Sequence, residues 1–199
     1  MLDSWPAGRE ERETMMPSSF ADTELTLRDG RRVQLRAIRR SDEDEILQAF
    51  ERLDPGARYM RFMRVVREAN VTKLRKLLAS FPESGTGLVA TVPAADGIDI
   101  VGSTLLLIDN DPASGEFSVT VAAEYGRTGL GHALMSALIG AAKARGLVEM
   151  HGFVLRVNTP MLRLAEGLGF TISADPDDPS VVICRLRLDN PSATRSSTH

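Results

Sequence analysis

Alternating apolar and polar residues mark several short stretches of the chain, and this period of two predicts strands. Residues 24–38, ELTLRDGRRVQLRAI, contain two alternating runs joined at Asp29-Gly30, a pair typical of tight hairpin turns. Further strands are predicted, in chain order, at 86–93, 98–109, 115–121, 149–157, 170–173 and 181–188.

Other stretches repeat their apolar residues every three or four positions, which predicts amphipathic helices. Segment 42–53 has acidic residues in its first turn, and Ser41 stands where an N-cap is expected. The longest helix carries an apolar stripe of Leu130, Leu134, Leu138 and Ala142. The helices expected are 42–53, 57–63, 71–81, 129–145 and 159–169. Together with the strands, this order is typical of an α/β or α+β domain with a mixed sheet covered by helices.

Chain length and net charge limit the domain organisation and the kinds of partner that can be expected. A chain of 199 residues is expected to form one domain, here 23–188, between a flexible arm over 1–22 and a flexible tail over 189–199. A net charge of −3 argues against a nucleic-acid partner or a polybasic membrane surface. No window approaches the roughly 18 uncharged apolar residues of a membrane span, and the N-terminus lacks the pattern of a secretory signal. We therefore expect no membrane partner and a cytoplasmic location.

The single cysteine, Cys184, excludes an intramolecular disulfide framework. It lies in the alternating run VVICRLRL, so a packed strand thiol is favoured over a nucleophile. The three histidines show no metal-ligand spacing, and no metal is expected.

Three glycines, Gly126, Gly129 and Gly131, stand at the junction between the strand 115–121 and the long helix. The first amides of a helix have no internal partner, and glycine lets a ligand approach them closely, so the junction can bind a phosphate. It can also be merely a tight connection. The mononucleotide P-loop triplet Gly-Lys-Ser/Thr is absent, and Leu134 breaks the dinucleotide pattern G-x-G-x-x-G.

The stretch GRTGLG, 126–131, resembles motif A of the GNAT N-acetyltransferases, Q/R-x-x-G-x-G/A. Gly126 stands at the Gln/Arg position, and Arg127 follows one place later. The resemblance covers about 24–188. Within it, 28–63 and 152–170 are similar to the bacterial Pat-type protein-lysine acetyltransferases.

This resemblance implies the GNAT fold, a mixed and mostly antiparallel sheet with helices on both faces and an acetyl-CoA cleft between two splayed strands. It implies that main-chain groups of Val119 and Val121 pair with the pantetheine amides. Asn158 would contact acetyl-CoA from the far side of the cleft, a role that can coexist with capping the next helix. The pyrophosphate would be held by Gly126, Arg127, Thr128, Gly129, Leu130, Gly131, His132 and Ala133.

Acetyl transfer needs a neutral amine, because an ammonium group has no lone pair, and a base therefore helps. Alternation puts Glu116, Ser118 and Thr120 on the polar face of their strand, and the Pat-type enzymes carry a glutamate on this strand, so Glu116 is the candidate base. A solvated glutamate at a strand start is the alternative. Many GNAT enzymes have a tyrosine acid where this chain has Ala165, which leaves water to protonate the thiolate.

The function expected from the resemblance is acetyl-CoA-dependent N-acetylation, with a protein lysine as the acceptor. A small-molecule amine or amino-acid acetyltransferase and a non-catalytic acyl-CoA-binding regulatory module are the alternatives, because a fold does not fix an acceptor. The segment 59–68 can line the acceptor site, pack in the core or form a homodimer contact. The arginines at spacing three in and beside it are typical of a solvated helix face, with contact to CoA or an acidic protein surface as the alternative: Arg58, Arg61, Arg64 and Arg67.

Overall fold

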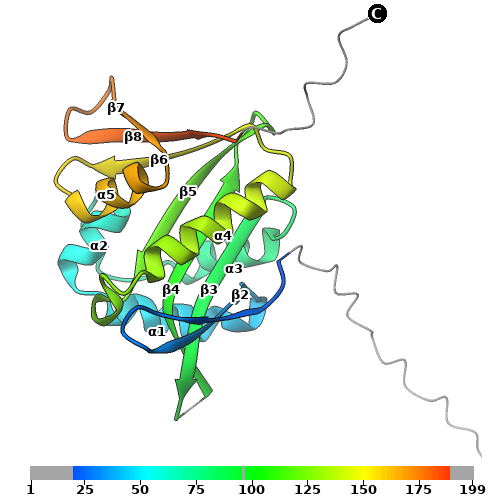
Figure 1. The fold of residues 1–199 in the computed structure, drawn as a ribbon. Helices are drawn as coiled ribbons and strands as arrows, with labels where there is room; N and C mark the ends of the chain where they lie inside the picture. The colour runs from blue at the N-terminus through cyan, green and yellow to red at the C-terminus, as the bar shows by residue number, and fades with distance from the viewer. Residues whose placement is uncertain (1–19, 96, 189–199) are drawn as a thin grey trace, which may run out of the picture.

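The computed structural model describes residues 20–95 and 97–188. Within them, eight strands form one sheet in the order β1-β2-β3-β4-β5-β6-β8-β7 (Figure 1). The strands are β1 Thr23–Thr26, β2 Arg32–Ala37, β3 Gly85–Ala94, β4 Gly97–Ile108, β5 Ser114–Val121, β6 Glu149–Leu155, β7 Thr171–Ala174 and β8 Val181–Arg187. All neighbours are antiparallel except β5 and β6, which confirms the mixed, mostly antiparallel sheet. The predicted tail, and the arm up to residue 19, lie outside the described residues.

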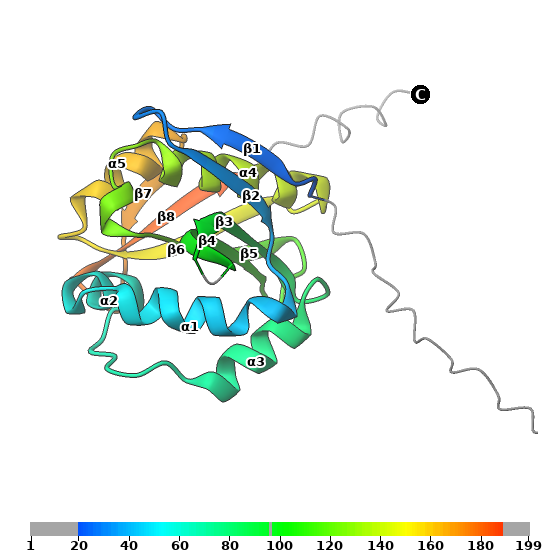
Figure 2. The same cartoon turned by 90° about the horizontal axis from the view of Figure 1, so that it is seen from below.

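Helices cover both faces of the sheet, as predicted. Figure 2 shows α4 on one face and α1, α2 and α3 on the opposite face. The helices are α1 Glu43–Arg52, α2 Pro55–Phe62, α3 Val71–Ser80, α4 Leu130–Ala144 and α5 Thr159–Gly167. No helix in the described part of the chain is long and apolar enough to cross a membrane.

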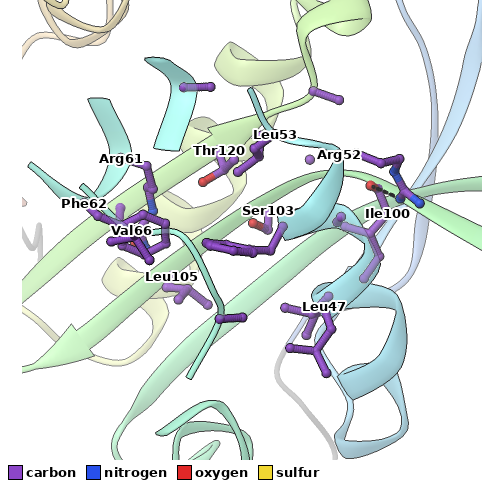
Figure 3. A pocket seen from close by; sticks show the side chains of 18 of the residues that line it. Leu47, Arg52, Leu53, Arg61, Phe62, Val66, Ile100, Ser103, Leu105 and Thr120 are labelled. Carbon is purple, nitrogen blue, oxygen red and sulfur yellow. Dashed lines mark hydrogen bonds between the residues drawn. The ribbon is translucent and has the colours of Figure 1, made fainter. Parts of the chain in front are cut away.

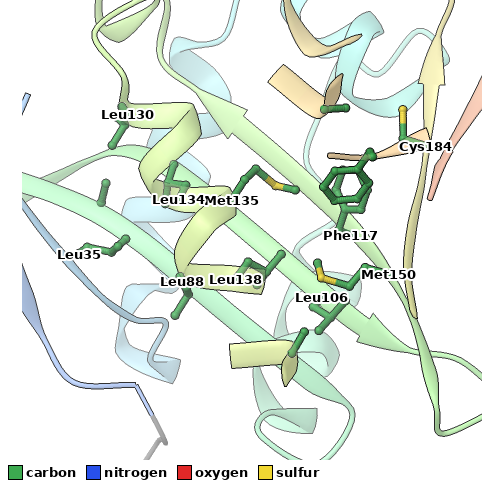
Figure 4. Packing of buried hydrophobic residues seen from close by; sticks show 14 of the residues in the cluster. Leu35, Leu88, Leu106, Phe117, Leu130, Leu134, Met135, Leu138, Met150 and Cys184 are labelled. Atoms are coloured by element: carbon green, nitrogen blue, oxygen red, sulfur yellow. The ribbon is translucent and has the colours of Figure 1, made fainter. Parts of the chain in front are cut away.

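The hydrophobic core lies between α4 and the sheet (Figure 4). The predicted stripe of α4 is confirmed, since Leu130, Leu134, Leu138 and Ala142 are fully buried. Cys184 of β8 is also fully buried, as expected for a packed strand thiol. Burial raises the pKa of this thiol to about 11, so it stays protonated and unreactive near neutral pH.

The predicted N-cap at Ser41 is wrong. Arg40–Asp42 forms a single 3-10 turn, and Asp42 takes the position before α1. The Asp42 carboxylate is buried, where it pairs with both terminal nitrogens of Arg36 at 2.7 Å and accepts the backbone N–H of Arg39 at 2.8 Å. This pairing fixes the start of α1 to β2, and a local capping rule cannot anticipate it.

Strands β5 and β6 separate soon after they pair. Their register joins only Ser114–Glu116 to Glu149–His151, although β5 continues to Val121 and β6 to Leu155. Figure 1 shows the two strands diverging. At the point of divergence the Phe117 ring packs so closely that a Cβ on Gly152 would lie 2.7 Å from two of its atoms. The splayed pair of strands is thereby confirmed.

Candidate active site

The free edge of β5 is the first component of the site. The backbone N–H of Ala122 donates to Val101 O at 2.9 Å, so the even-numbered residues of β5 direct their main-chain groups toward β4. By this alternation the N–H and C=O groups of Val119 and Val121 face the side from which β6 has diverged. Among the described residues these groups have no strand partner, and they can bind a polar chain laid along the edge.

The loop before α4 is the second component. Arg127 and Gly129 both adopt left-handed backbone conformations, with φ of +61° and +91°. Among the described residues, no hydrogen-bond acceptor meets the N–H groups of Arg127, Thr128, Gly129, Gly131 and His132. Together with the dipole of a helix of 15 residues, such amides form a concavity suited to an anion.

The remaining predicted loop amides are engaged within the protein. The N–H of Gly126 donates to Ala123 O, and that of Ala133 donates to Gly129 O, both at 3.0 Å. The N–H of Leu130 makes a longer contact of 3.4 Å with Thr128 Oγ1. The anion site therefore narrows to the five amides that have no acceptor.

Gly129 and Gly131 serve different purposes. Gly129 has a positive φ that other residues rarely adopt. Gly131 allows close packing, since a Cβ there would lie 3.3 Å from Leu164 Cδ2 of α5. The glycine pattern thus reflects both a bare main chain and a tight contact between two helices.

A cavity of about 620 Å³ lies between the sheet and the helices α1, α2 and α3 (Figure 3). Glu116, Ser118 and Thr120 of β5 line it. Phe117 and Val121 also border it, but the ring of Phe117 is buried in the core against Phe170. This confirms the predicted alternation along the strand. Glu116 is exposed to this space and is therefore accessible to a substrate.

The cavity also contains a guanidinium group. Arg61, near the end of α2, donates from Nη2 to Ser118 Oγ at 2.7 Å. Burial lowers the pKa of Arg61, and the negative charge of Glu116 acts in the opposite direction. The solvated-face interpretation is therefore wrong for Arg61, because its guanidinium is buried against Ser118.

The solvated-face interpretation is also wrong for Arg58. Its guanidinium carbon lies 4.5 Å from the centre of the Phe50 ring, and the guanidinium donates to Arg67 O and Glu51 O. The helix α2 ends at Phe62, so Arg64 and Arg67 do not continue its face.

Comparison with known proteins identifies the family. Residues 32–171 match the family described as acetyltransferase (GNAT) domain. Over 163 residues, 82% of this chain and 88% of the relative, the sequence is 32% identical to acetyltransferase PA5475 of Pseudomonas aeruginosa.

The chain belongs to the GNAT acetyltransferases. It is therefore an N-acetyltransferase, and solved GNAT structures share its fold. The GNAT domain of S. lividans PAT superposes with a TM-score of 0.76 at 18% identity, over 84% of this chain and 97% of that one. The Salmonella typhimurium protein yncA, solved with its cofactor acetyl-CoA, gives a TM-score of 0.64 at 19% identity, over 83% and 99% of the two chains.

In this GNAT domain the β1–β2 turn braces the loop before α4. The N–H of Arg28 donates to Thr128 O at 3.0 Å. Arg31 donates from Nη2 to Glu124 O at 2.7 Å, and its guanidinium carbon lies 3.9 Å from the centre of the Tyr125 ring. Tyr125 is buried, so it is a packing residue. The sequence gives no sign of these contacts, because the two segments lie far apart in the chain.

Arg28 also places positive charge next to the free amides. A Cβ on Gly129 would lie 3.5 Å from Arg28 Nε, so the arginine side chain crosses this face of the loop. None of the ion pairs among the described residues involves its guanidinium. Arg28 thus adds positive charge beside Thr128 and Gly129 of the loop.

The side chain of Asn158 caps α5, accepting the N–H of Met161 at 3.3 Å, which confirms the capping role. The side chain of His132 is exposed and lies 3.3 Å from Ser136 Oγ through Nδ1. Ala165 is fully buried and carries no group that could act as an acid. No cluster of metal-binding side chains occurs in residues 20–95 and 97–188.

Proposed function

We propose that this N-acetyltransferase binds acetyl-CoA between β5 and β6 and acetylates a primary amine in the cavity beside Glu116. One observation carries the proposal: the single strand β5 borders both the gap toward β6 and the cavity under α1, α2 and α3. The main-chain edge of β5 at Val119 and Val121 faces the gap toward β6, and its polar side chains line the cavity. An acyl donor on the edge and an amine in the cavity therefore meet across the same strand.

The anion site fits the pyrophosphate of CoA. The five free amides of Arg127, Thr128, Gly129, Gly131 and His132 would hold it, with the α4 dipole adding positive potential. Val119 and Val121 would pair with the pantetheine amides. Asn158, at the end of the loop after β6, would contact acetyl-CoA through its NH₂ group, because its oxygen already caps α5.

Acetyl-CoA supplies the acetyl group as a thioester, so that a C–N bond forms as the C–S bond breaks. Glu116 accepts the proton that the amine loses, directly or through water, which leaves the nitrogen lone pair free to attack. The Val121 main-chain N–H would stabilise negative charge on the thioester oxygen. With Ala165 in place of an acid, the thiolate takes its proton from water.

The acceptor we propose is a lysine side chain of a protein. The similarity of 28–63 and 152–170 to Pat-type enzymes supports it. A free small amine is the second candidate, and the cavity favours it: a volume of about 620 Å³ with many apolar walls lies within the range of small-molecule sites.

The test has two arms. Calorimetry with acetyl-CoA should show micromolar binding that Gly129→Glu abolishes, while Gly140→Glu, the same change at an open position of α4, should bind as wild type. Release of CoA thiol is then followed with lysine-containing proteins, lysine peptides and free amines. Release that depends on an amine supports the proposal. Binding without turnover of any amine would instead indicate a non-catalytic acyl-CoA module, and absence of binding would overturn the proposal.

A further inference from the structure

Among the described residues the Arg61 guanidinium has no ion-pair partner, although the charge of Glu116 favours its charged form and the centre of the Phe62 ring lies 5.0 Å from its Cζ. Its guanidinium carries five N–H donors, and a neutral hydroxyl, Ser118 Oγ, is the acceptor described for it. No carboxylate of the described residues lies within ion-pair distance. A partly buried guanidinium without a carboxylate partner destabilises the protein unless an anion binds to it.

The surroundings of Arg61 indicate what kind of anion would enter. Most of the cavity wall is apolar and comes from α1, α3 and the sheet, including Leu47, Phe50, Leu74 and Leu105 (Figure 3). Arg61 and Glu116 both lie in this cavity, and the guanidinium is held at Ser118, two residues along the same face from Glu116. That spacing is roughly 7 Å along a strand.

We infer that Arg61 binds a carboxylate of the acceptor molecule, so that the cavity takes an amine that also carries a carboxylate on an apolar body. The inference rests on the proposed function. Glu116 faces the amine, Arg61 pairs with the carboxylate, and the apolar wall covers the remainder. An apolar amino acid presents this chemistry through its α-carboxylate, and a lysine peptide presents it through a neighbouring acidic residue.

Bidentate recognition suits arginine better than lysine, because the planar guanidinium matches both carboxylate oxygens. Loss of one charge-assisted pair corresponds to about 10- to 100-fold in kcat/KM. The loss should fall mainly on KM, since Arg61 would bind the acceptor rather than the reacting atoms.

The experiment compares acceptor pairs that differ in the carboxylate: leucine against leucinamide, and a lysine peptide with a neighbouring Glu against the same peptide with Gln. Wild type should prefer the carboxylate-bearing member of at least one pair by 10-fold or more, at the level expected for a charged pair. Arg61→Gln should abolish that preference, and Arg61→Lys should restore part of it. Which pair shows the preference distinguishes a free amino acid from a peptide.

Arg67→Gln, at an exposed arginine outside the cavity, is the control and should retain the preference. Acetyl-CoA affinity should be unchanged in all three variants, and all three should remain folded at the assay temperature. If Arg61→Gln slows every acceptor equally, or moves the pH–rate profile for all of them alike, the arginine acts on Glu116 or on the fold and the inference is overturned. If the wild type turns over both members of each pair equally well, the inference about Arg61 is overturned but the proposed function is not. If the wild type turns over no amine, the proposed function itself is overturned.

Discussion

The two faces of β5 are packed in opposite ways. On one face Phe117 is buried against α4 and meets Phe170 edge-on, with ring centroids 5.0 Å apart. On the other face Glu116, Ser118 and Thr120 line an open cavity, which the helices α1, α2 and α3 cover. One strand thus separates a region that provides stability from a region that provides chemistry.

The difference shows how the site can remain accessible without loss of the fold. Close packing on the α4 face fixes the position of β5, so its opposite face can keep polar side chains and empty space. Polar contacts that attach the helices over the cavity to the sheet include Arg36–Asp42, Arg52–Asp99 and Arg61–Ser118. Among these, the Arg36–Asp42 pair at the start of α1 is the most buried.

The largest expected effect on stability follows from removing the Phe117 ring from the buried face of β5. Phe117→Ala should lower the free energy of unfolding by about 3–5 kcal/mol, because it removes a buried ring and leaves a cavity. Phe153→Ala on β6, where the ring is 38% exposed, is the matched control and should cost much less. Urea denaturation measures both. Equal losses would show that the packed face is not the stabilising one.

Breaking the Arg36–Asp42 pair, which attaches α1 to the sheet, should lower the free energy of unfolding nearly as much. Asp42→Ala leaves the buried Arg36 guanidinium without its carboxylate, a loss of about 3–5 kcal/mol for a buried pair, and part of it is recovered if water enters. Asp44→Ala, at an exposed position of α1, should change stability by no more than about 0.5 kcal/mol. Acetyl-CoA affinity, measured on the folded fraction, should stay at the wild-type value, since Asp42 lies far from the loop before α4.

The smallest effect concerns Cys184 and its dependence on pH. The unfolded thiol releases its proton near pH 9.0, whereas the folded thiol holds it to about pH 11. Rising pH in this window therefore favours the unfolded chain, and wild-type stability should fall more steeply between pH 9 and 11 than that of Cys184→Ala. Parallel pH profiles for the two proteins would contradict this. Native Cys184 should also resist thiol reagents at pH 8.

The fold was largely predictable because hydrophobic periodicity is a local property. The order of strands and helices, the stripe on α4 and the alternation along β5 follow from spacing alone, and the predicted sheet between helices is confirmed. The buried Asp42 was not predictable, since its partner Arg36 is chosen by tertiary structure and overrides the capping preference of Ser41.

Within the site, the sequence pointed to Glu116 and the glycine loop through motif and resemblance. It could not indicate that Gly131 packs on Leu164, nor that Arg28 and Arg31 brace the loop, because these contacts join distant segments. Arg61 was placed on a solvated face, since its spacing matches three other arginines. Tertiary packing instead buries its guanidinium against the hydroxyl of Ser118, and α2 ends before Arg64 and Arg67.

The role of Glu116 tests the contrast between the two faces most directly. The measurement is kcat for CoA release by Glu116→Gln at saturating acetyl-CoA and amine, with Glu83→Gln, at an exposed site away from the cavity, as control. Loss of a positioned base should lower kcat by about 10²- to 10⁴-fold while acetyl-CoA affinity and melting temperature stay unchanged. A kcat for Glu116→Gln equal to that of Glu83→Gln would show that the polar face of β5 does not carry the chemistry.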